Sequence, residues 1–320
     1  MNFNLFNRPL KTANIVFTDS SIRFMETIQK PKQEILQMKE HPLTPGMIKE
    51  GKITNPEMFR IVMEQCVTNW NIKRRDVRFL IPDPFIIVRQ VNVPVDIQED
   101  ELNGYLFLET GTSIHLPFED PVIDSVILKK EKNHQEILLV AAPREIVESY
   151  VQLFEDVKLK AEVAEISPLS LYRLYKSASM TKKDDHVLLL NYDKDLLTIS
   201  IFHDDIPIFV RPITAEFLLQ NTIEMIGEED AFYIDDAIAE IEKVMDFYQY
   251  TLNQGKVWIK RVILSGDHHN LHIVRERLRN RLQLPVDQLE LSEYATIDGK
   301  IITPSYFSIL GLSLKEVDSK

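Results

Sequence analysis

The segment Asp267 to His272 has the residue types that a metal site needs. It reads Asp-His-His-Asn-Leu-His, and on a helix His268 and His272 would share one face because they are four residues apart. The helix-borne zinc-protease pattern also requires a glutamate directly after the first histidine, and His269 stands at that position. We therefore interpret the segment as a capped, solvated start of a helix, and we predict no metal site.

Other groupings of reactive side chains do not form a recognisable catalytic site. Ser20-Ser21 lacks a nearby histidine and no GxSxG motif is present, so nucleophilic catalysis by serine is unsupported. Cys66 lies on the apolar face of a predicted helix, where a packed thiol is expected. An acidic loop at 228–230 and an acidic helix start at Asp235-Asp236 explain the remaining carboxylates better than paired acid–base catalysis does. We predict no catalytic residue.

The spacing of the glycines argues against a phosphate-binding loop. No two of the nine glycines are closer than five residues, so GG, GxG and GxxG are all absent. Phosphate loops use glycine because the backbone must approach the anion closely, with positive φ allowed. The chain therefore has neither a P-loop nor a dinucleotide-binding fingerprint.

The composition indicates an ordinary globular protein of two domains. The 320 residues are 44% hydrophobic and 27% charged, and the net charge of −12 argues against nucleic acid, and against an anionic membrane surface, as a main partner. The single cysteine excludes an internal disulfide framework and is typical of the reducing cytoplasm. We find no signal-peptide pattern and no apolar run of the roughly 18 residues that a membrane span requires.

Two strand–turn–strand patterns, about half a chain apart, suggest two halves built on one plan. The first covers residues 13–26 with a polar turn at 19–21. The second covers 186–213, where Asn191 to Lys194 predicts a sharp turn and 203–205 a polar joint. Helix–strand alternation follows each pattern, so the chain is predicted to be an α/β protein with two domains.

Local patterns define further elements between and after these hairpins. A helix begins either with a capping box of Thr54 and Glu57 or with Asn55 as cap and Pro56 in the first position. Residues 28–48 are polar with scattered prolines, so they are predicted to be a connecting segment.

The strongest predicted helix covers 235–254, and 214–226 is predicted to be a shorter helix before it. A helix, a hairpin and a helix over 92–160 predict a compact αββα-like insert. The buried stripe of the strongest helix is expected to contain Ile238, Ile241, Val244, Met245, Tyr248 and Leu252.

An ordered set of short motifs resembles the PilM family, which comprises actin-like (ASKHA superfamily) cytoplasmic proteins of type IV pilus assembly that are themselves similar to the cell-division protein FtsA. The most specific motif is Glu240 to Tyr248, a helix ending in a Phe-Tyr pair, followed by a strand into Ser265-Gly266. The resemblance runs nearly end to end. Further matching stretches are 43–48, 114–118, the strand start at Asp124, 139–144 and 309–312.

The resemblance implies an actin-like ATPase (ribonuclease H-like) fold with a nucleotide between its two lobes. In that family two D-x-G hairpins hold phosphates and Mg²⁺, and a Gly-Gly turn approaches the adenosine. Aligned here, all three elements depart from the pattern. The corresponding positions are Val16, Thr18, Asp19 and Ser20 in the first hairpin, Asn191 and Asp193 in the second, and Ser265, Gly266 and Asp267 in the turn.

These departures predict lost or weak nucleotide binding. Val16 replaces the metal-side aspartate, so nothing obvious there orients hydrated Mg²⁺. Asp193 puts a carboxylate where phosphate oxygens would come close. We therefore expect no cofactor and a degenerate ATPase that serves as a scaffold, because function depends on the site and not on the fold. The alternative is an active ATPase that binds ATP with Mg²⁺ through Asp19, Asp193 and Ser265.

The resemblance also implies a partner. Family members bind the cytoplasmic N-terminal tail of PilN, a single-span membrane protein, in a groove between the first subdomain and its insert. We expect a PilN-like partner here, with indirect links to the pilus assembly ATPase or platform protein and no nucleic acid. The groove candidates are Phe79, Phe85, Tyr105 and Phe107, for each of which core packing is the alternative.

The predicted organisation follows from these assignments. Residues 1–91 and 161–178 form the first actin-like lobe, 92–160 the inserted subdomain and 186–320 the second lobe. We expect a cytoplasmic adaptor of type IV pilus or competence pseudopilus assembly, held at the inner face of the cell membrane through its partner. An FtsA-like filament former is the third hypothesis, and a homo-oligomer is left open.

Overall fold

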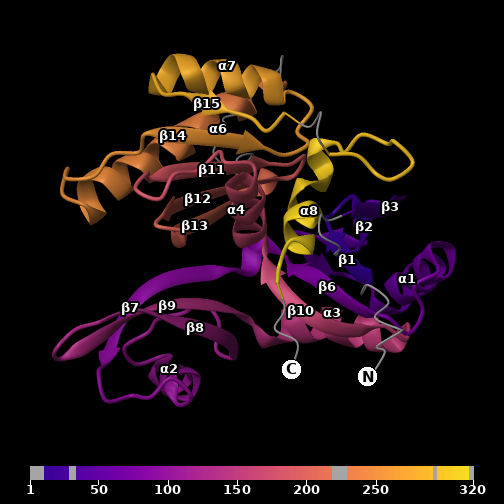
Figure 1. Cartoon of the computed structure of the whole chain (residues 1–320), viewed down its shortest axis with the longest axis horizontal. Helices are drawn as coiled ribbons and strands as arrows, with labels where there is room; N and C mark the ends of the chain where they lie inside the picture. The colour runs from indigo at the N-terminus through magenta and orange to yellow at the C-terminus, as the bar shows by residue number, and fades with distance from the viewer. Residues whose placement is uncertain (1–10, 29–33, 218–228, 291–293, 317–320) are drawn as a thin grey trace, which may run out of the picture. The chain divides into compact units, whose positions relative to one another are not determined.

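The computed structural model describes residues 11–28, 34–217, 229–290 and 294–316 (Figure 1). The chain divides into two compact units, and each is discontinuous in sequence. Unit 1 comprises residues 1–82, 150–174 and 290–320, and unit 2 comprises 83–149 and 175–289.

Unit 1 is built on a five-stranded sheet in the order β10-β6-β1-β2-β3. β1 and β2 form the predicted antiparallel hairpin, and β6 and β10 extend the sheet in parallel on the other side of β1. The strands are β1 Lys11–Phe17, β2 Ser21–Ile28, β3 Glu34–Pro42, β6 Asp76–Ile81 and β10 Lys160–Ile166.

β3 corrects our prediction that residues 28–48 only connect two elements. It pairs antiparallel with β2 along Glu34 to Pro42 and forms an edge of the sheet. An edge strand needs few buried side chains, and its residues are mostly partly or fully exposed. The polar composition of β3 therefore hid a strand.

The first helix, α1 Pro56–Trp70, begins with Asn55 as its cap, which was the second of the two predicted alternatives. The side chain of Asn55 accepts a hydrogen bond from the amide of Met58 at 3.0 Å, and Pro56 takes the first helical position. Thr54 instead donates its hydroxyl to the carbonyl of Gly46 at 2.6 Å. Phe59 and Met63 of α1 are buried, which places the apolar face of the helix in the core of unit 1.

The remaining elements of unit 1 include a short hairpin and further helices. Val157 and Leu159 are buried at the end of the segment that leads from α3 into β10. The elements are β4 Ile48–Lys49, β5 Lys52–Ile53, the C-terminal part of α3 Arg144–Asp156, and most of α4 Ser167–Ser177.

The last helix, α8 Phe307–Ser313, belongs to unit 1 and packs on β1, β2 and β6 (Figure 1). A short 3-10 turn, η3 Pro304–Tyr306, leads into it. Arg23 of β2 donates to the carbonyl of Ser305 at 3.0 Å, and Arg78 of β6 donates to that of Lys315 at 2.6 Å. These contacts group residues 290–320 with unit 1, whereas we predicted them within the second lobe.

A buried carboxylate holds the end of this segment in place. Arg173 of α4 forms two hydrogen bonds with the Glu165 carboxylate, at 2.9 and 2.6 Å, and Lys315 adds a third at 2.8 Å. The Glu165 side chain is only 2% exposed. A buried carboxylate without these partners would strongly destabilise the unit, so the three side chains tie α4, β10 and the residues after α8 together.

Unit 2 contains a second five-stranded sheet in the order β13-β12-β11-β14-β15. β11, β12 and β13 form the antiparallel meander that the apolar runs predicted, and β14 and β15 add parallel strands. The strands are β11 Val187–Tyr192, β12 Leu196–His203, β13 Ile206–Thr214, β14 Arg261–Ser265 and β15 Val286–Asp287.

Two helices, α6 Glu229–Asp246 and α7 Leu271–Leu282, contribute buried residues to the same core as this sheet. Our acidic loop at 228–230 is wrong for Glu229 and Asp230, which lie in α6, and Glu228 lies outside the described residues. Most of the predicted helix 214–226 also lies outside them.

The end of the long helix differs from the prediction in its winding. α6 passes into a π-helical turn, η2 Phe247–Leu252. Tyr248 is 1% exposed, as predicted, but Leu252 is 50% exposed. A π turn contains more residues than an α turn, and Leu252 therefore leaves the buried stripe on which α-helical spacing would place it.

The insert of unit 2 is a three-stranded antiparallel sheet, β7-β9-β8, with one short helix against it (Figure 1). We predicted β7 in the first lobe and an αββα order, but β7 pairs with β9 and opens the insert. A 3-10 turn, η1 Asp83–Phe85, precedes it. The elements are β7 Ile87–Pro94, α2 Leu102–Glu109, β8 Pro121–Lys130 and β9 His134–Pro143.

In the part of the chain that the structure describes, no helix is long and apolar enough to cross a membrane.

Candidate functional site

The turn between β1 and β2 is closed by its own hydroxyl groups. The Thr18 hydroxyl oxygen accepts hydrogen bonds from the amides of Ser21 at 2.9 Å and Ser20 at 3.3 Å. This arrangement is a local side-chain-to-backbone turn of the kind that threonine and serine favour. Val16 is 7% exposed and lies among core residues, so its side chain offers no polar atom at this turn.

Asp19 of this turn is held by a neighbouring hairpin within unit 1. Its two carboxylate oxygens accept hydrogen bonds from the amides of Glu50 at 2.6 Å and Gly51 at 2.9 Å. Both of these residues have positive φ, at 49° and 79°, and join β4 to β5. The carboxylate therefore stabilises a tight turn, and both of its oxygens are already engaged.

The corresponding turn of unit 2, between β11 and β12, is closed by a side-chain network. The Asn191 amide group donates to Asp193 at 2.8 Å, and the Ser265 hydroxyl donates to the Asn191 side-chain oxygen at 3.0 Å. The amide of Asp267 donates to Asp193 at 3.3 Å, and the amide of Lys194 donates to Asp267 at 3.2 Å. The end of β11 and the end of β14 are therefore bound to each other at five residues.

Gly266 lets these two strand ends approach. Its φ is +116°, and an added Cβ would lie 2.0 Å from the carbonyl oxygen of Tyr192. No side chain fits at that distance from a backbone atom. The amide of His268 then donates to the same carbonyl at 3.0 Å. The single glycine retained in this turn therefore serves the packing of β14 on β11.

The network lies over a buried phenol. Tyr175 is completely buried, and burial, with the negative charge of Asp193 adding to it, raises the pKa of its hydroxyl well above the usual range. Ser265 is also buried, at 1% exposure. Tyr175 thus stays a neutral phenol at physiological pH, and it cannot serve as a base.

Taken one unit at a time, the nine predicted nucleotide-site residues fall into two groups. Val16, Thr18, Asp19 and Ser20 lie together at the first turn, and Asn191, Asp193, Ser265, Gly266 and Asp267 lie together at the second. The sequence did not reveal the partners of Asp19, although Glu50-Gly51 between two short apolar-basic pairs is a hairpin signal that could have identified them.

The histidines that could suggest a metal site are arranged differently. The His268 ring stacks on Tyr192 at 4.3 Å, and its Nδ1 accepts a hydrogen bond from the amide of Asn270 at 3.2 Å. Among the described residues no group of three or more His, Cys, Asp or Glu side chains could hold a metal ion. Burial raises the pKa of Cys66 to about 12, so its thiol stays protonated and unreactive.

The four groove candidates differ in exposure. Phe79 is 1% exposed and packs against Tyr150 and Phe154 in the core of unit 1. For this residue the alternative of core packing is therefore correct. Phe85, in η1, and Tyr105, in α2, are half-buried. Phe107, also in α2, is 44% exposed, so its side chain is open to a partner.

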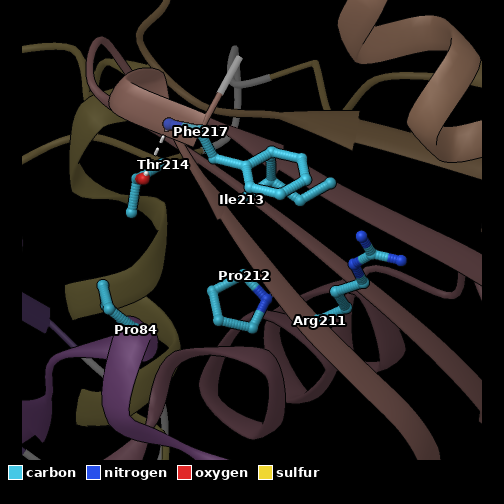
Figure 2. Close-up of a pocket in the computed structure, with 6 residues that line it drawn as sticks. All are labelled: Pro84, Arg211, Pro212, Ile213, Thr214 and Phe217. Carbon is cyan, nitrogen blue, oxygen red and sulfur yellow. Dashed lines mark hydrogen bonds between the residues drawn. The ribbon is translucent and has the colours of Figure 1, made fainter. Parts of the chain in front are cut away.

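A small pocket of about 190 Å³ lies in unit 2 between η1 and β13 (Figure 2). None of the thirteen predicted site residues lines it, and its volume is below the roughly 300 Å³ at which small-molecule sites begin. Figure 2 shows the amide of Phe217 donating to the Thr214 hydroxyl, at 3.3 Å. The lining residues are Pro84, Arg211, Pro212, Ile213, Thr214 and Phe217.

Comparison with known proteins places these features in a family. The model of the family described as type IV pilus assembly protein PilM matches residues 15–217. The solved structure of a PilM–PilN type IV pilus biogenesis complex is similar, with a TM-score of 0.73 and 16% identity over 96% of this chain and 98% of that one.

Two further solved structures share the fold at lower similarity. The ethanolamine utilization protein EutJ from Carboxydothermus hydrogenoformans has a TM-score of 0.51 and 10% identity over 96% of this chain and 90% of that one. A Bacteroides thetaiotaomicron protein with an actin-like ATPase fold has a TM-score of 0.50 and 12% identity over 90% of this chain and 94% of that one. These likenesses confirm the predicted actin-like fold. Among curated proteins, none matches this chain.

Proposed function

Because the chain belongs to the PilM family of type IV pilus assembly proteins, we propose that it is an adaptor that uses its actin-like fold to bind a protein tail and does not hydrolyse ATP. The machine it serves is a type IV pilus or a competence pseudopilus. The main support for the proposal is that the Asp193 carboxylate is already bound within its own turn. It accepts hydrogen bonds from the side chain of Asn191 and from the amide of Asp267.

The electrostatics of the second turn support the loss of nucleotide binding. Asp193 places a carboxylate where the resemblance puts phosphate oxygens, and Asp267 places a second carboxylate in the turn that would approach the adenosine. Like charges repel a polyphosphate. The backbone amides of Asp267 and Lys194 are used within the turn, so they are not available to an anion. Asp19 is likewise engaged by two amides, so neither of its carboxylate oxygens is prepared for Mg²⁺.

Thermal melting with ATP and Mg²⁺ tests this part of the proposal. A ligand that binds only the folded state must raise the melting temperature, and saturation at 100 times the Kd corresponds to about 2.7 kcal/mol. We expect no shift at millimolar ATP. A rise of several degrees that Asp193→Ala or Asn191→Ala abolishes would overturn it and favour an active ATPase.

The proposed partner is the cytoplasmic tail of a PilN-like membrane protein. A similar solved structure is a PilM–PilN complex, and the insert of this chain exposes apolar side chains to which a tail could bind. On α2, the neighbouring side chains of Phe107 and Leu108 are 44% and 77% exposed. Exposed apolar side chains gathered in one place commonly mark an interaction surface.

Fluorescence anisotropy with a labelled tail peptide tests the partner. We expect binding at tens of micromolar or tighter, and Phe107→Ala with Leu108→Ser is expected to weaken it about tenfold, or 1.4 kcal/mol. Leu252→Ser is the control, because Leu252 is 50% exposed but belongs to η2. Absence of binding at tens of micromolar by the full chain would contradict the adaptor role.

The proposed location is the inner face of the cell membrane, reached through this partner, with indirect links to the pilus assembly ATPase or platform protein. Fractionation of cells with and without the PilN-like protein tests it. We expect the chain to leave the membrane fraction when the partner is absent.

A further inference from the structure

The π-helical turn at the end of α6 turns apolar side chains away from the core. Tyr248 and Gln249 are buried on its inner side, while Phe247 is 42%, Tyr250 55% and Leu252 50% exposed. Had the α-helix continued, Leu252 would lie four residues beyond buried Tyr248 on the same stripe. The π turns found in proteins are frequently at functional sites, so the side chains that this turn exposes are candidates for a functional contact.

The segment after the turn is held against it by specific hydrogen bonds. The side-chain oxygen of Gln249 accepts a hydrogen bond from the amide of Ile259 at 3.1 Å, and its carbonyl accepts one from Gly255 at 2.8 Å. These bonds place Trp258 next to the turn, where its ring meets Tyr250 edge to face at 5.6 Å. Trp258 is still 51% exposed. Two large aromatic rings are therefore fixed in position without being covered.

The same segment carries local positive charge. From Phe247 to Lys260 the sequence contains two lysines and no aspartate or glutamate, in a chain whose net charge is −12. Lys256 and Lys260 are exposed, and neither ammonium group forms an ion pair with any residue that the structure describes. This short segment therefore exposes apolar and cationic side chains together. We name the six of them the aromatic–lysine surface: Phe247, Tyr250, Leu252, Lys256, Trp258 and Lys260.

Tyrosine and tryptophan beside lysine are the residues that proteins place at the level of lipid headgroups. The rings enter the interface, and the ammonium groups, on long flexible stems, reach the phosphates. We propose that the aromatic–lysine surface of unit 2 binds an anionic lipid headgroup layer. An acidic peptide could pair with the lysines, but it offers no apolar layer to cover the two exposed rings and Leu252. An anionic lipid surface offers both the negative charge and the apolar layer.

Two lysines give only weak attraction, and the overall negative charge of the chain opposes it. The binding is therefore weakened by salt. It is stronger when another contact already holds the protein at a membrane, because the aromatic–lysine surface then meets the lipid at a high effective concentration. The inference goes beyond the adaptor function and does not depend on it, since it rests only on side chains of unit 2.

The test uses the full chain with vesicles and without any protein partner. Vesicles of phosphatidylcholine with phosphatidylglycerol are compared, at low salt, with vesicles of phosphatidylcholine alone, by co-sedimentation and by tryptophan emission. Trp70 is 5% exposed and stacks on Phe24, so a blue shift on binding reports on Trp258. We expect binding and a blue shift only with the anionic vesicles.

Matched variants sharpen the result. Lys256→Gln with Lys260→Gln is expected to weaken vesicle binding roughly tenfold, and Trp258→Ala with Tyr250→Ala to abolish it. Lys39→Gln with Lys132→Gln is the control, because both lysines are exposed elsewhere and their loss changes the net charge equally. Melting curves check that each variant is folded.

Three outcomes would overturn the proposal: no binding to anionic vesicles, equal binding to neutral ones, or an equal loss in the control pair. A blue shift produced by the partner's tail peptide in the absence of lipid, with no shift on vesicles, would overturn it too and would assign the surface to a protein.

Discussion

The turn that follows β1 and the turn that follows β11 occupy equivalent places in their two sheets, yet they are closed by different groups. In the first, the Asp19 carboxylate accepts from the backbone amides of Glu50 and Gly51. In the second, Asn191, Asp193 and Ser265 bond mainly to one another. One turn is therefore stabilised by a neighbouring hairpin, and the other by side chains from the ends of two strands.

The two turns show two different ways in which residue types typical of nucleotide sites can take structural roles. The first turn uses a carboxylate as a structural acceptor, which keeps an aspartate in the sequence but engages both of its oxygens. The second turn keeps a glycine, Gly266, but uses it for contact between backbones. Residue types typical of nucleotide sites thus persist in both places with structural roles.

The largest effect is expected from Gly266→Ala. The added methyl would meet the Tyr192 backbone at 2.0 Å, at a φ of +116°, so β14 must move away from β11. We expect the free energy of unfolding to fall by roughly 3–5 kcal/mol, measured by urea unfolding. Gly255→Ala is the control, because its φ is +73° but nothing lies within 4 Å of the added atom. An equal loss in both variants would show that backbone strain alone is responsible.

The next effect is expected from Asp19→Ala. Two hydrogen bonds to a charged acceptor are lost, and we expect a destabilisation of about 2 kcal/mol, with Asp19→Asn losing less because it keeps one acceptor oxygen. Amide hydrogen exchange should accelerate at Glu50 and Gly51 in both variants. Unchanged protection of these two amides would contradict the structural role of Asp19.

A smaller effect is expected from Asp193→Ala, about 1 kcal/mol. The variant loses the hydrogen bond from Asn191, but it also removes one of two neighbouring carboxylates and their mutual repulsion. Comparison with Asp19→Ala by the same urea titration decides whether the two turns differ as described. A larger loss for Asp193→Ala would reverse their order.

The smallest effect concerns pH at the opposite end of β11. His186 stacks on His203 at 3.9 Å and shares a hydrogen bond with the Tyr248 hydroxyl at 2.7 Å. Burial, then the positive charge of His203 and of Lys260, lowers the pKa of His186 from 6.5, although Asp204 and Asp185 act in the opposite direction.

Because the pKa of His186 is lower in the folded state, its contribution is fully present above pH 6.5 and is lost as the pH falls from there through the folded value. We expect the melting temperature to fall between pH 7.5 and pH 5.5, and His186→Asn to reduce that fall. His115→Asn, at an exposed histidine, is the comparison variant, and an equal reduction of the fall in both variants would contradict the role of His186.

Elements that depend on neighbouring residues in the chain could be predicted from the sequence. The β1–β2 hairpin, the β11–β12–β13 meander and the cap at Asn55 follow from alternating apolar runs, polar turns and a Pro in the first helical position.

Features set by distant residues could not be predicted. β3 reads as a polar linker because an edge strand buries little, and α8 packs on strands almost 300 residues earlier in the chain. The π turn that exposes Leu252 lies where Gln249 accepts a hydrogen bond from the returning segment, at Ile259, ten residues later in the chain. For the same reason the amides that engage Asp19 were visible only in the structure.

The placement of α8 has a consequence for how the protein is made. During synthesis the segment 175–289 can begin to fold while unit 1 still lacks its third piece. One apolar face of the strands β1, β2 and β6 stays uncovered until α8 has been synthesised. Only then can Arg23 and Arg78 donate to the carbonyls of Ser305 and Lys315. The first part of the chain to leave the ribosome is thus expected to be among the last to reach its native state.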